Sequence, residues 1–72
     1  MCIRDRFEVK ETSRVNGKFI REIEFPRSAI IGGIVRDGVG NIALGDFKIQ
    51  EGDRVVVCCL PDSISKIERL FI

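Results

Sequence analysis

Two segments of the chain carry apolar side chains at every position, without the polar alternation of a half-buried strand. Residues 29–35 read AIIGGIV and residues 55–60 read VVVCCL. Successive side chains on a strand point to opposite faces of the sheet, so a strand with one wet face alternates apolar and polar residues. The pattern therefore predicts two strands that are apolar on both faces and lie next to each other in one sheet.

The N-terminal third carries shorter signals. Residues 7–11 alternate between apolar and polar side chains, which predicts a short strand with one wet face. Residues 17–24 are predicted to form a helix, with Asn16 as its N-cap and apolar residues before and after that cap at the spacing of a hydrophobic staple. Pro26 marks the end of the helix because the residue before a proline is pushed out of helical geometry.

The second half of the chain continues with turn signals. Asp37-Gly38 predicts a hairpin turn, and residues 41–44 predict its return strand. Pro61 suits the first turn of a helix, and apolar positions recur at helical spacing from there to Phe71. The predicted order is β-α-β-β-β-α, an α+β domain with a mainly antiparallel sheet packed with two short helices.

With 72 residues, the chain is predicted to be one small domain or a fragment of something larger. Residues 1–6 lack the apolar core of a signal peptide and connect poorly with the pattern that follows. We predict that residues 1–6 are a non-native or disordered leader and that residues 7–72 form the domain.

Strands that are apolar on both faces need both faces of the sheet to be shielded from water. A fully buried Val or Ile contributes about 1.5–3 kcal/mol, so several exposed ones would cost a small domain much of its stability. We predict that a companion surface covers the sheet, either an identical subunit or another part of a longer polypeptide. The alternative is that the two short helices lie on opposite faces and complete the fold within one chain.

Composition excludes several function classes. The net charge is +1, the charges are mixed in sign, and the chain has no Trp and no Tyr, so we predict no nucleic-acid partner. No apolar run approaches the roughly 20 residues of a membrane span, so we predict no direct insertion into a membrane. The chain also has no histidine, which removes the usual general base and the commonest metal ligand.

The remaining reactive residues have simpler explanations. Cys58 and Cys59 are adjacent and point to opposite faces of a strand, so they are poorly placed to share a metal; with Cys2 they are typical of reduced thiols in a cytosolic protein. Asp37, Asp46, Asp53 and Cys58 are the best candidates for catalysis, but each fits a turn or a core and none has a general base as partner. We predict no catalytic residues, no metal site and no enzyme activity.

One stretch of the first apolar strand stands out. Gly32-Gly33 in the middle of a strand is typical of a bulge or of close approach by another backbone or a ligand. Arg36 at the end of that strand is a candidate for binding an anion. The alternative for Arg36 is a strand-end charge that pairs with Asp37 or Asp53.

The ordered series of motifs resembles the TrkA-C domain family, the C-terminal modules of proteins that regulate potassium conductance. The resemblance spans residues 7–71. It rests on five segments: residues 15–23, 25–38, 41–46, 50–62 and 64–71. Residues 30–36 and the end near Phe71 are most similar to the last domain of the regulatory subunit of Trk potassium-uptake systems.

The resemblance implies a non-enzymatic regulatory domain that forms a homodimer and biases the gating of a transporter. Such a domain follows a Rossmann-type RCK N-terminal nucleotide-binding domain, works with a membrane K⁺ transporter subunit, and lies in the cytoplasm at the inner face of the plasma membrane. The resemblance places any NAD or ATP in that separate domain, so we predict no cofactor in this chain. The alternative is a TrkA-C module that acts as a structural dimer clamp on another ion or anion transporter.

The resemblance also implies a ligand-binding cleft between two subunits, with cyclic di-AMP as a candidate effector. The residues matching that cleft are Ile30, Ile31, Gly32, Gly33 and Arg36. The alternative is that these residues only build the dimer core.

Overall fold

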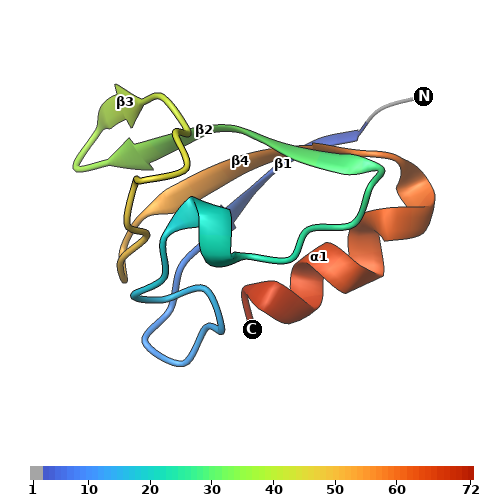
Figure 1. The fold of residues 1–72 in the computed structure, drawn as a ribbon, viewed down its shortest axis with the longest axis horizontal. Helices are drawn as coiled ribbons and strands as arrows, with labels where there is room; N and C mark the ends of the chain where they lie inside the picture. The colour runs from blue at the N-terminus through green and yellow to red at the C-terminus, as the bar shows by residue number, and fades with distance from the viewer. Residues whose placement is uncertain (1–2) are drawn as a thin grey trace.

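The computed structural model describes residues 3–72, which form one antiparallel sheet and a C-terminal helix (Figure 1). The elements in chain order are β1 (Ile3–Glu8), the 3₁₀ turn η1 (Ile20–Glu22), β2 (Ala29–Arg36), β3 (Val39–Asn41), β4 (Arg54–Cys59), the 3₁₀ turn η2 (Pro61–Ser63) and α1 (Ile64–Leu70). The four strands are ordered β1-β4-β2-β3 across the sheet. The predicted α+β class and the antiparallel sheet are confirmed.

The two apolar strands are neighbours, as predicted. β2 and β4 pair antiparallel, with Ala29 opposite Cys59 and Val35 opposite Arg54, and the register shifts between Ile31 and Gly33. This shift is a β-bulge, which places one extra residue on β2. Because of the bulge, odd-numbered positions of β2 face the core before it and even-numbered positions after it. Ala29 is buried on the first side and Ile34 on the second.

One face of the sheet is closed by the chain itself. β4 contributes Val55, Val57 and Cys59 to the buried core, and Ile67 of α1 joins the same cluster. Phe71 follows the helix and stacks on a strand residue, Phe7, with their ring centroids 4.9 Å apart. The helix and the residues after it therefore cover this face (Figure 1).

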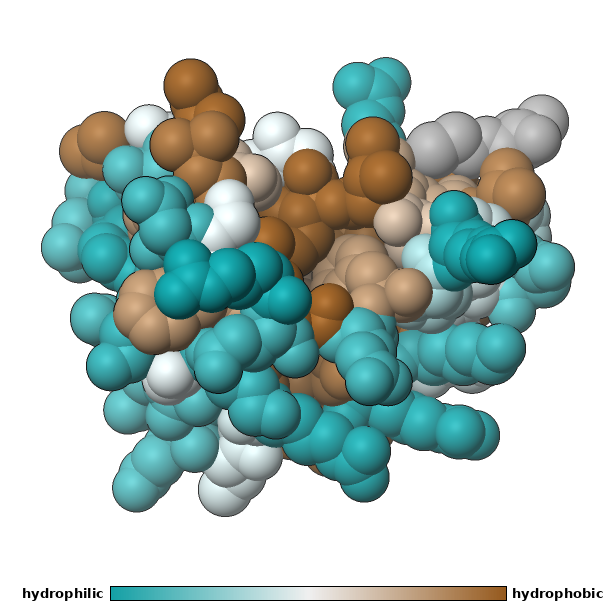
Figure 2. Space-filling view, in the orientation of Figure 1, coloured by the Kyte–Doolittle hydropathy of each residue, from teal (hydrophilic) through white to brown (hydrophobic). Residues whose placement is uncertain are grey.

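The opposite face has no such cover. Within residues 3–72 no helix lies over it, and Ile30, the second residue of β2, is 65% exposed on this face. Val56 and Cys58 on β4 point the same way and are half-buried. Apolar side chains gather across the upper half of Figure 2, where Figure 1 places β2 and β3, while the lower half is mostly hydrophilic. We call this face of the sheet, which carries Ile30, Val56 and Cys58, the open face.

The predicted first helix is wrong. Of residues 17–24, only Ile20–Glu22 form a single 3₁₀ turn. Gly17 has a φ of +80°, in the left-handed region that a right-handed helix cannot use. Asn16 does not cap a helix, because its Oδ1 accepts a hydrogen bond from the Glu51 amide at 3.0 Å. The sheet is therefore packed with one short helix and not two.

Two boundaries also differ from the prediction. β1 begins at Ile3 and ends at Glu8, and its residues 3–6 pair with β4, so this part of the predicted leader belongs to the fold. Residues 1–2 lie outside the described part of the chain. The hairpin turn at residues 37–38 is confirmed, with φ of +51° and +78°, but its return strand is Val39–Asn41 and not residues 41–44.

Candidate functional site

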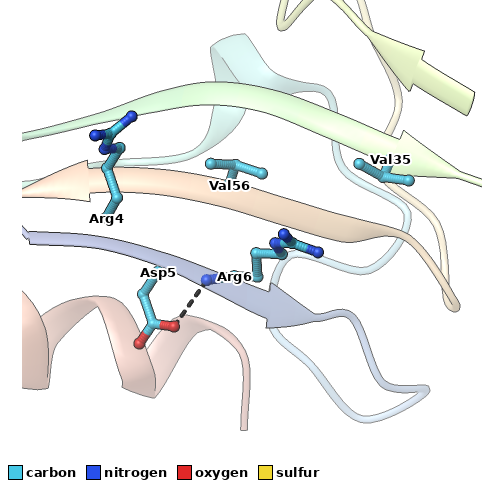
Figure 3. Close-up of a pocket in the computed structure, with 5 residues that line it drawn as sticks. All are labelled: Arg4, Asp5, Arg6, Val35 and Val56. Atoms are coloured by element: carbon cyan, nitrogen blue, oxygen red, sulfur yellow. Dashed lines mark hydrogen bonds between the residues drawn. The ribbon is translucent and has the colours of Figure 1, made fainter.

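The open face carries two adjoining hollows. The first, of about 730 Å³, is lined by Arg4, Asp5, Arg6, Val35 and Val56. Figure 3 shows the side chains of Arg4 and Arg6 on the same side of the sheet as the two valines, while Asp5 points the other way. The alternation of β1 places these two cations along one edge of an apolar surface.

The second hollow, of about 520 Å³, is centred on the bulge of β2. Its lining comes from all four strands and the residue after β3: Arg4, Gly32, Gly33, Ile34, Val35, Gly40, Asn41, Ile42, Val56 and Cys58. A Cβ at Gly33 would lie 3.6 Å from the Asn41 carbonyl oxygen, and a Cβ at Gly32 would lie 3.7 Å from the Val56 carbonyl oxygen. Both distances are ordinary van der Waals contacts, so a side chain would fit at either position. The two glycines therefore leave open space above the strand.

A third, smaller hollow of about 220 Å³ lies between β2 and the segments around η1 and β3. It is lined by Ile20, Ile23, Phe25, Ala29, Ile30, Ile31 and Ala43, all of them apolar. The structure thus divides the predicted site residues between two hollows, with Gly32 and Gly33 in one and Ile30 and Ile31 in the other. Prediction missed Val56 and Cys58, although their spacing of two along β4 indicated a shared face.

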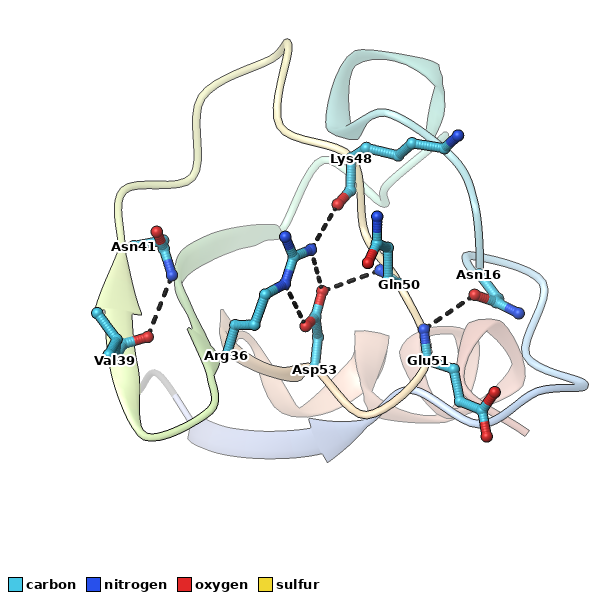
Figure 4. Close-up of polar contacts among 8 residues, drawn as sticks. All are labelled: Asn16, Arg36, Val39, Asn41, Lys48, Gln50, Glu51 and Asp53. Atoms are coloured by element: carbon cyan, nitrogen blue, oxygen red, sulfur yellow. Dashed lines mark hydrogen bonds and ion pairs between the residues drawn. The ribbon is translucent and has the colours of Figure 1, made fainter.

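Arg36 lines none of these three hollows. Its Nε donates a hydrogen bond to Asp53 Oδ1 at 2.8 Å, and its Nη2 donates to Asp53 Oδ2 at 2.7 Å and to the Lys48 carbonyl oxygen at 2.8 Å (Figure 4). Its guanidinium carbon also lies 4.7 Å from the centre of the Phe47 ring. Of the two alternatives for Arg36, the structure shows the pairing with Asp53, and the Arg36 side chain remains 34% exposed.

The electrostatics of this pair follow from its burial. Asp53 is only 1% exposed. Burial raises the pKa of its carboxyl, but the hydrogen bonds from Arg36 and from the Gln50 amide and the attraction of the guanidinium outweigh this and leave the pKa below its ordinary value. The hydrogen bond to Asp53 raises the pKa of Arg36 above its ordinary value. Both groups are therefore charged at neutral pH.

Of the other candidates for catalysis, Asp37 and Asp46 lie in turns, as the sequence favoured. Cys58 is half-buried on β4 and lines the second hollow, so it lies outside the core. Among residues 3–72 no group of His, Cys, Asp and Glu side chains is arranged to hold a metal ion. In the same range, no helix has the length and apolar character needed to cross a membrane.

With the geometry described, comparison with known proteins shows the family. The family model of the TrkA-C domain matches residues 6–72. The chain belongs to the TrkA-C domain family. This confirms the resemblance to that family seen in the sequence motifs.

Two relatives are more than a third identical to this chain over the aligned residues. The chain is 37% identical over 65 residues to "Trk system potassium uptake protein TrkA homolog 1" of Methanosarcina mazei, which covers 90% of this chain. It is 39% identical over 64 residues to "Trk system potassium uptake protein TrkA" of Azorhizobium caulinodans, which covers 89% of it. The chain spans about 14% of the length of each of these relatives.

A solved structure agrees with this TrkA-C fold. A chain described as "Structure of RCK domain with cda" superposes with a TM-score of 0.79, covering 93% of this chain and 96% of its own length. The sequence identity is 18%, so the likeness concerns the fold alone.

Proposed function

We propose that this chain is the regulatory domain of a Trk-type potassium-uptake system and that it self-associates through the open face of its sheet. The observation that carries the proposal is the uncovered apolar face, on which Ile30 is 65% exposed. A small domain gains much of its stability from buried apolar area, so a second copy that covers this face adds stability as well as specificity. Membership of the TrkA-C family and the names of the relatives support the potassium-uptake context.

Self-association also supplies a ligand site. Two open faces brought together turn the shallow hollow around Gly32 and Gly33 into an enclosed cleft, and a symmetric ligand suits the two-fold axis of such a dimer. Cyclic di-AMP is the first effector to test. Arg36 is engaged by Asp53, so the cations available to a phosphate are Arg4, which lines both larger hollows, and Arg6, which lines the first.

An effector of this kind acts by population shift. A ligand that binds one arrangement of the dimer better than another increases the population of that arrangement, by no more than its difference in affinity. A separate RCK N-terminal domain, which would bind NAD or ATP, passes the shift to a membrane K⁺ transporter subunit. In this proposal the domain lies in the cytoplasm at the inner face of the plasma membrane and has no catalytic role.

One observation favours a second candidate function. The only predicted cation of the site, Arg36, makes its hydrogen bonds within the chain. A module that serves as a structural dimer clamp on another ion or anion transporter needs the apolar face but no charged ligand site. The two functions differ in whether a nucleotide binds.

The experiment uses analytical ultracentrifugation of the 72-residue chain and of the variant Ile30→Lys. We expect the wild type to sediment as a dimer at micromolar concentration and the variant to remain a folded monomer. Ile72→Lys is the matched control, because Ile72 is 70% exposed but lies after α1 beside Phe71. A wild type that stays monomeric at all practical concentrations, or equal association of both variants, contradicts the proposal.

Calorimetry with cyclic di-AMP then separates the two functions. Binding heat that is present in the wild type and lost in Ile30→Lys supports the ligand-sensing dimer. Dimerisation without any heat from cyclic di-AMP or related nucleotides supports the clamp.

A further inference from the structure

The segment formed by residues 42–49 is attached mainly to a part of the chain outside the sheet. Its backbone pairs with residues 17–21, through hydrogen bonds from the Arg21 amide to the Gly45 carbonyl oxygen at 3.0 Å and from the Ile49 amide to the Lys18 carbonyl oxygen at 2.9 Å. Lys48 also forms an isolated antiparallel bridge with Phe19. We call residues 42–49 the border segment.

The border segment forms one wall of two hollows. In the hollow of about 520 Å³, Ile42 lies on the border side and Gly32 and Gly33 on the sheet side. In the hollow of about 220 Å³, Ala43 faces Ile31 in the same way. The width of both hollows therefore depends on the distance between the border segment and β2.

Arg36 spans this distance with polar contacts. It belongs to β2, and its guanidinium donates one hydrogen bond to the Lys48 carbonyl oxygen of the border segment and two to Asp53 (Figure 4). The same group lies over the ring of Phe47, which is also in the border segment. A planar guanidinium fixes the direction of its partners better than an ammonium does, because its donors are held in a rigid fork.

The geometry points to Arg36 as a positioning residue. We infer that its bridge to Lys48 and Asp53 holds the border segment at a fixed distance from β2, and so sets the shape of both hollows without contacting what binds there. The relevance of that shape to a ligand rests on the proposed function, but the positioning itself does not. It is a property of the single chain and is tested in the monomer.

The experiment compares amide hydrogen exchange by NMR in Arg36→Gln and in the matched control Arg27→Gln, an exposed arginine. Both substitutions are made in the Ile30→Lys background, which is expected to keep the chain monomeric at the concentrations that NMR requires. We expect the amides of Ile20, Phe47 and Ile49, which are hydrogen-bonded in this region, to exchange at least tenfold faster in Arg36→Gln. The amides of β4 serve as the internal reference and are expected to change much less, because they report global unfolding.

A second readout addresses the hollow directly. Cys58 and Ile42 both line the hollow of about 520 Å³. Release of the border segment is therefore expected to raise the rate at which Cys58 reacts with a bulky thiol reagent at least threefold. The measurement is made with Cys2→Ser in all samples, and Cys58→Ser identifies the signal.

Two outcomes overturn the inference. One is unchanged exchange in the border segment, and the other is an equal increase in β4, which would make the bridge a general contribution to stability. If Arg36→Gln does not fold, Arg36→Lys replaces it, since it keeps the charge but loses the fork, and a smaller increase in the same amides is expected. Loss of dimerisation in the earlier experiment leaves this result unaffected, so the two failures are distinguishable.

Discussion

Ile30 and Ile34 offer a direct comparison of the two faces of the sheet. Both lie on β2, and the substitution of each by alanine removes the same three carbon atoms. Ile30 is 65% exposed on the open face, whereas Ile34 is 1% exposed on the covered face. Any difference between the two substitutions in the isolated chain therefore measures the cover that the chain gives to each face.

The magnitudes follow from burial. Three buried methyl or methylene groups contribute about 2.4 kcal/mol, at about 0.8 kcal/mol each. Ile34→Ala leaves a cavity as well, so we expect a loss of about 3–5 kcal/mol in the free energy of unfolding. About a third of Ile30 is buried, which gives a loss of about 0.8 kcal/mol for Ile30→Ala. A difference of about 2 kcal/mol or more corresponds to about 8–16 °C in Tm for a domain of this size.

The assay is urea unfolding followed by circular dichroism, at two protein concentrations. At the lower concentration, where the chain sediments as a monomer, the two losses are expected to differ as described. At the higher concentration self-association adds stability by mass action, and Ile30→Ala is expected to become more costly while Ile34→Ala changes less. Equal losses at the lower concentration, within about 0.5 kcal/mol, would refute one-sided coverage. If Ile34→Ala does not fold, the pair Ile34→Val and Ile30→Val tests the same difference.

Three further predictions concern single contacts. Gly38→Ala is expected to cost about 1 kcal/mol in unfolding free energy, because Gly38 has a φ of +78°, whereas Gly40→Ala on the same hairpin is expected to cost clearly less; thermal unfolding compares them. The pKa of Asp53 is lowered in the folded state, so the ionised carboxylate stabilises the fold at neutral pH, and this contribution is lost as the pH falls below about 4. Asp53→Asn is expected to flatten the dependence of the unfolding free energy on pH in that range. An unchanged slope contradicts the prediction. Ser13→Ala is expected to cost about 1–3 kcal/mol, measured by urea unfolding, because the buried Ser13 hydroxyl donates to the Phe71 carbonyl oxygen at 3.0 Å; a loss below about 0.5 kcal/mol contradicts it.

The turn between β2 and β3 and the β2–β4 pair could be predicted because their signals are local and strong. Two runs without polar residues, a turn at residues 37–38 and a proline before α1 specify the strands and their ends. The bulge at Gly32 was also indicated by the two glycines, although its effect on which side chains face the core required the pairing with β4.

The first helix failed because the predicted segment was short and its backbone had better partners. A helix of about eight residues is marginal by itself. The amides of Gly17 and Ile20 instead donate to the carbonyl oxygens of Ile49 and Phe47, at 2.8 Å and 3.0 Å. Those partners are about 30 positions away in the sequence, and no local pattern announces them.

The role of Arg36 depended on the same kind of distant contact. The sequence left open whether this side chain binds an anion or pairs with an acid. Asp53 is separated from it by 17 positions, and only the neighbouring registers of β2 and β4 bring the two together. Position at a strand end was therefore enough to single out the residue but not to assign its partner.

The strand order β1-β4-β2-β3 has a consequence for biosynthesis. β4 lies between β1 and β2, so the earliest strand has no neighbour in the sheet until residues 54–59 have left the ribosome. At about 5–20 residues per second, the nascent chain therefore carries an unpaired β1 for several seconds. During this time the charged side chains of Arg4, Asp5 and Arg6 protect β1, because charges on an unpaired strand disfavour its pairing with other nascent chains.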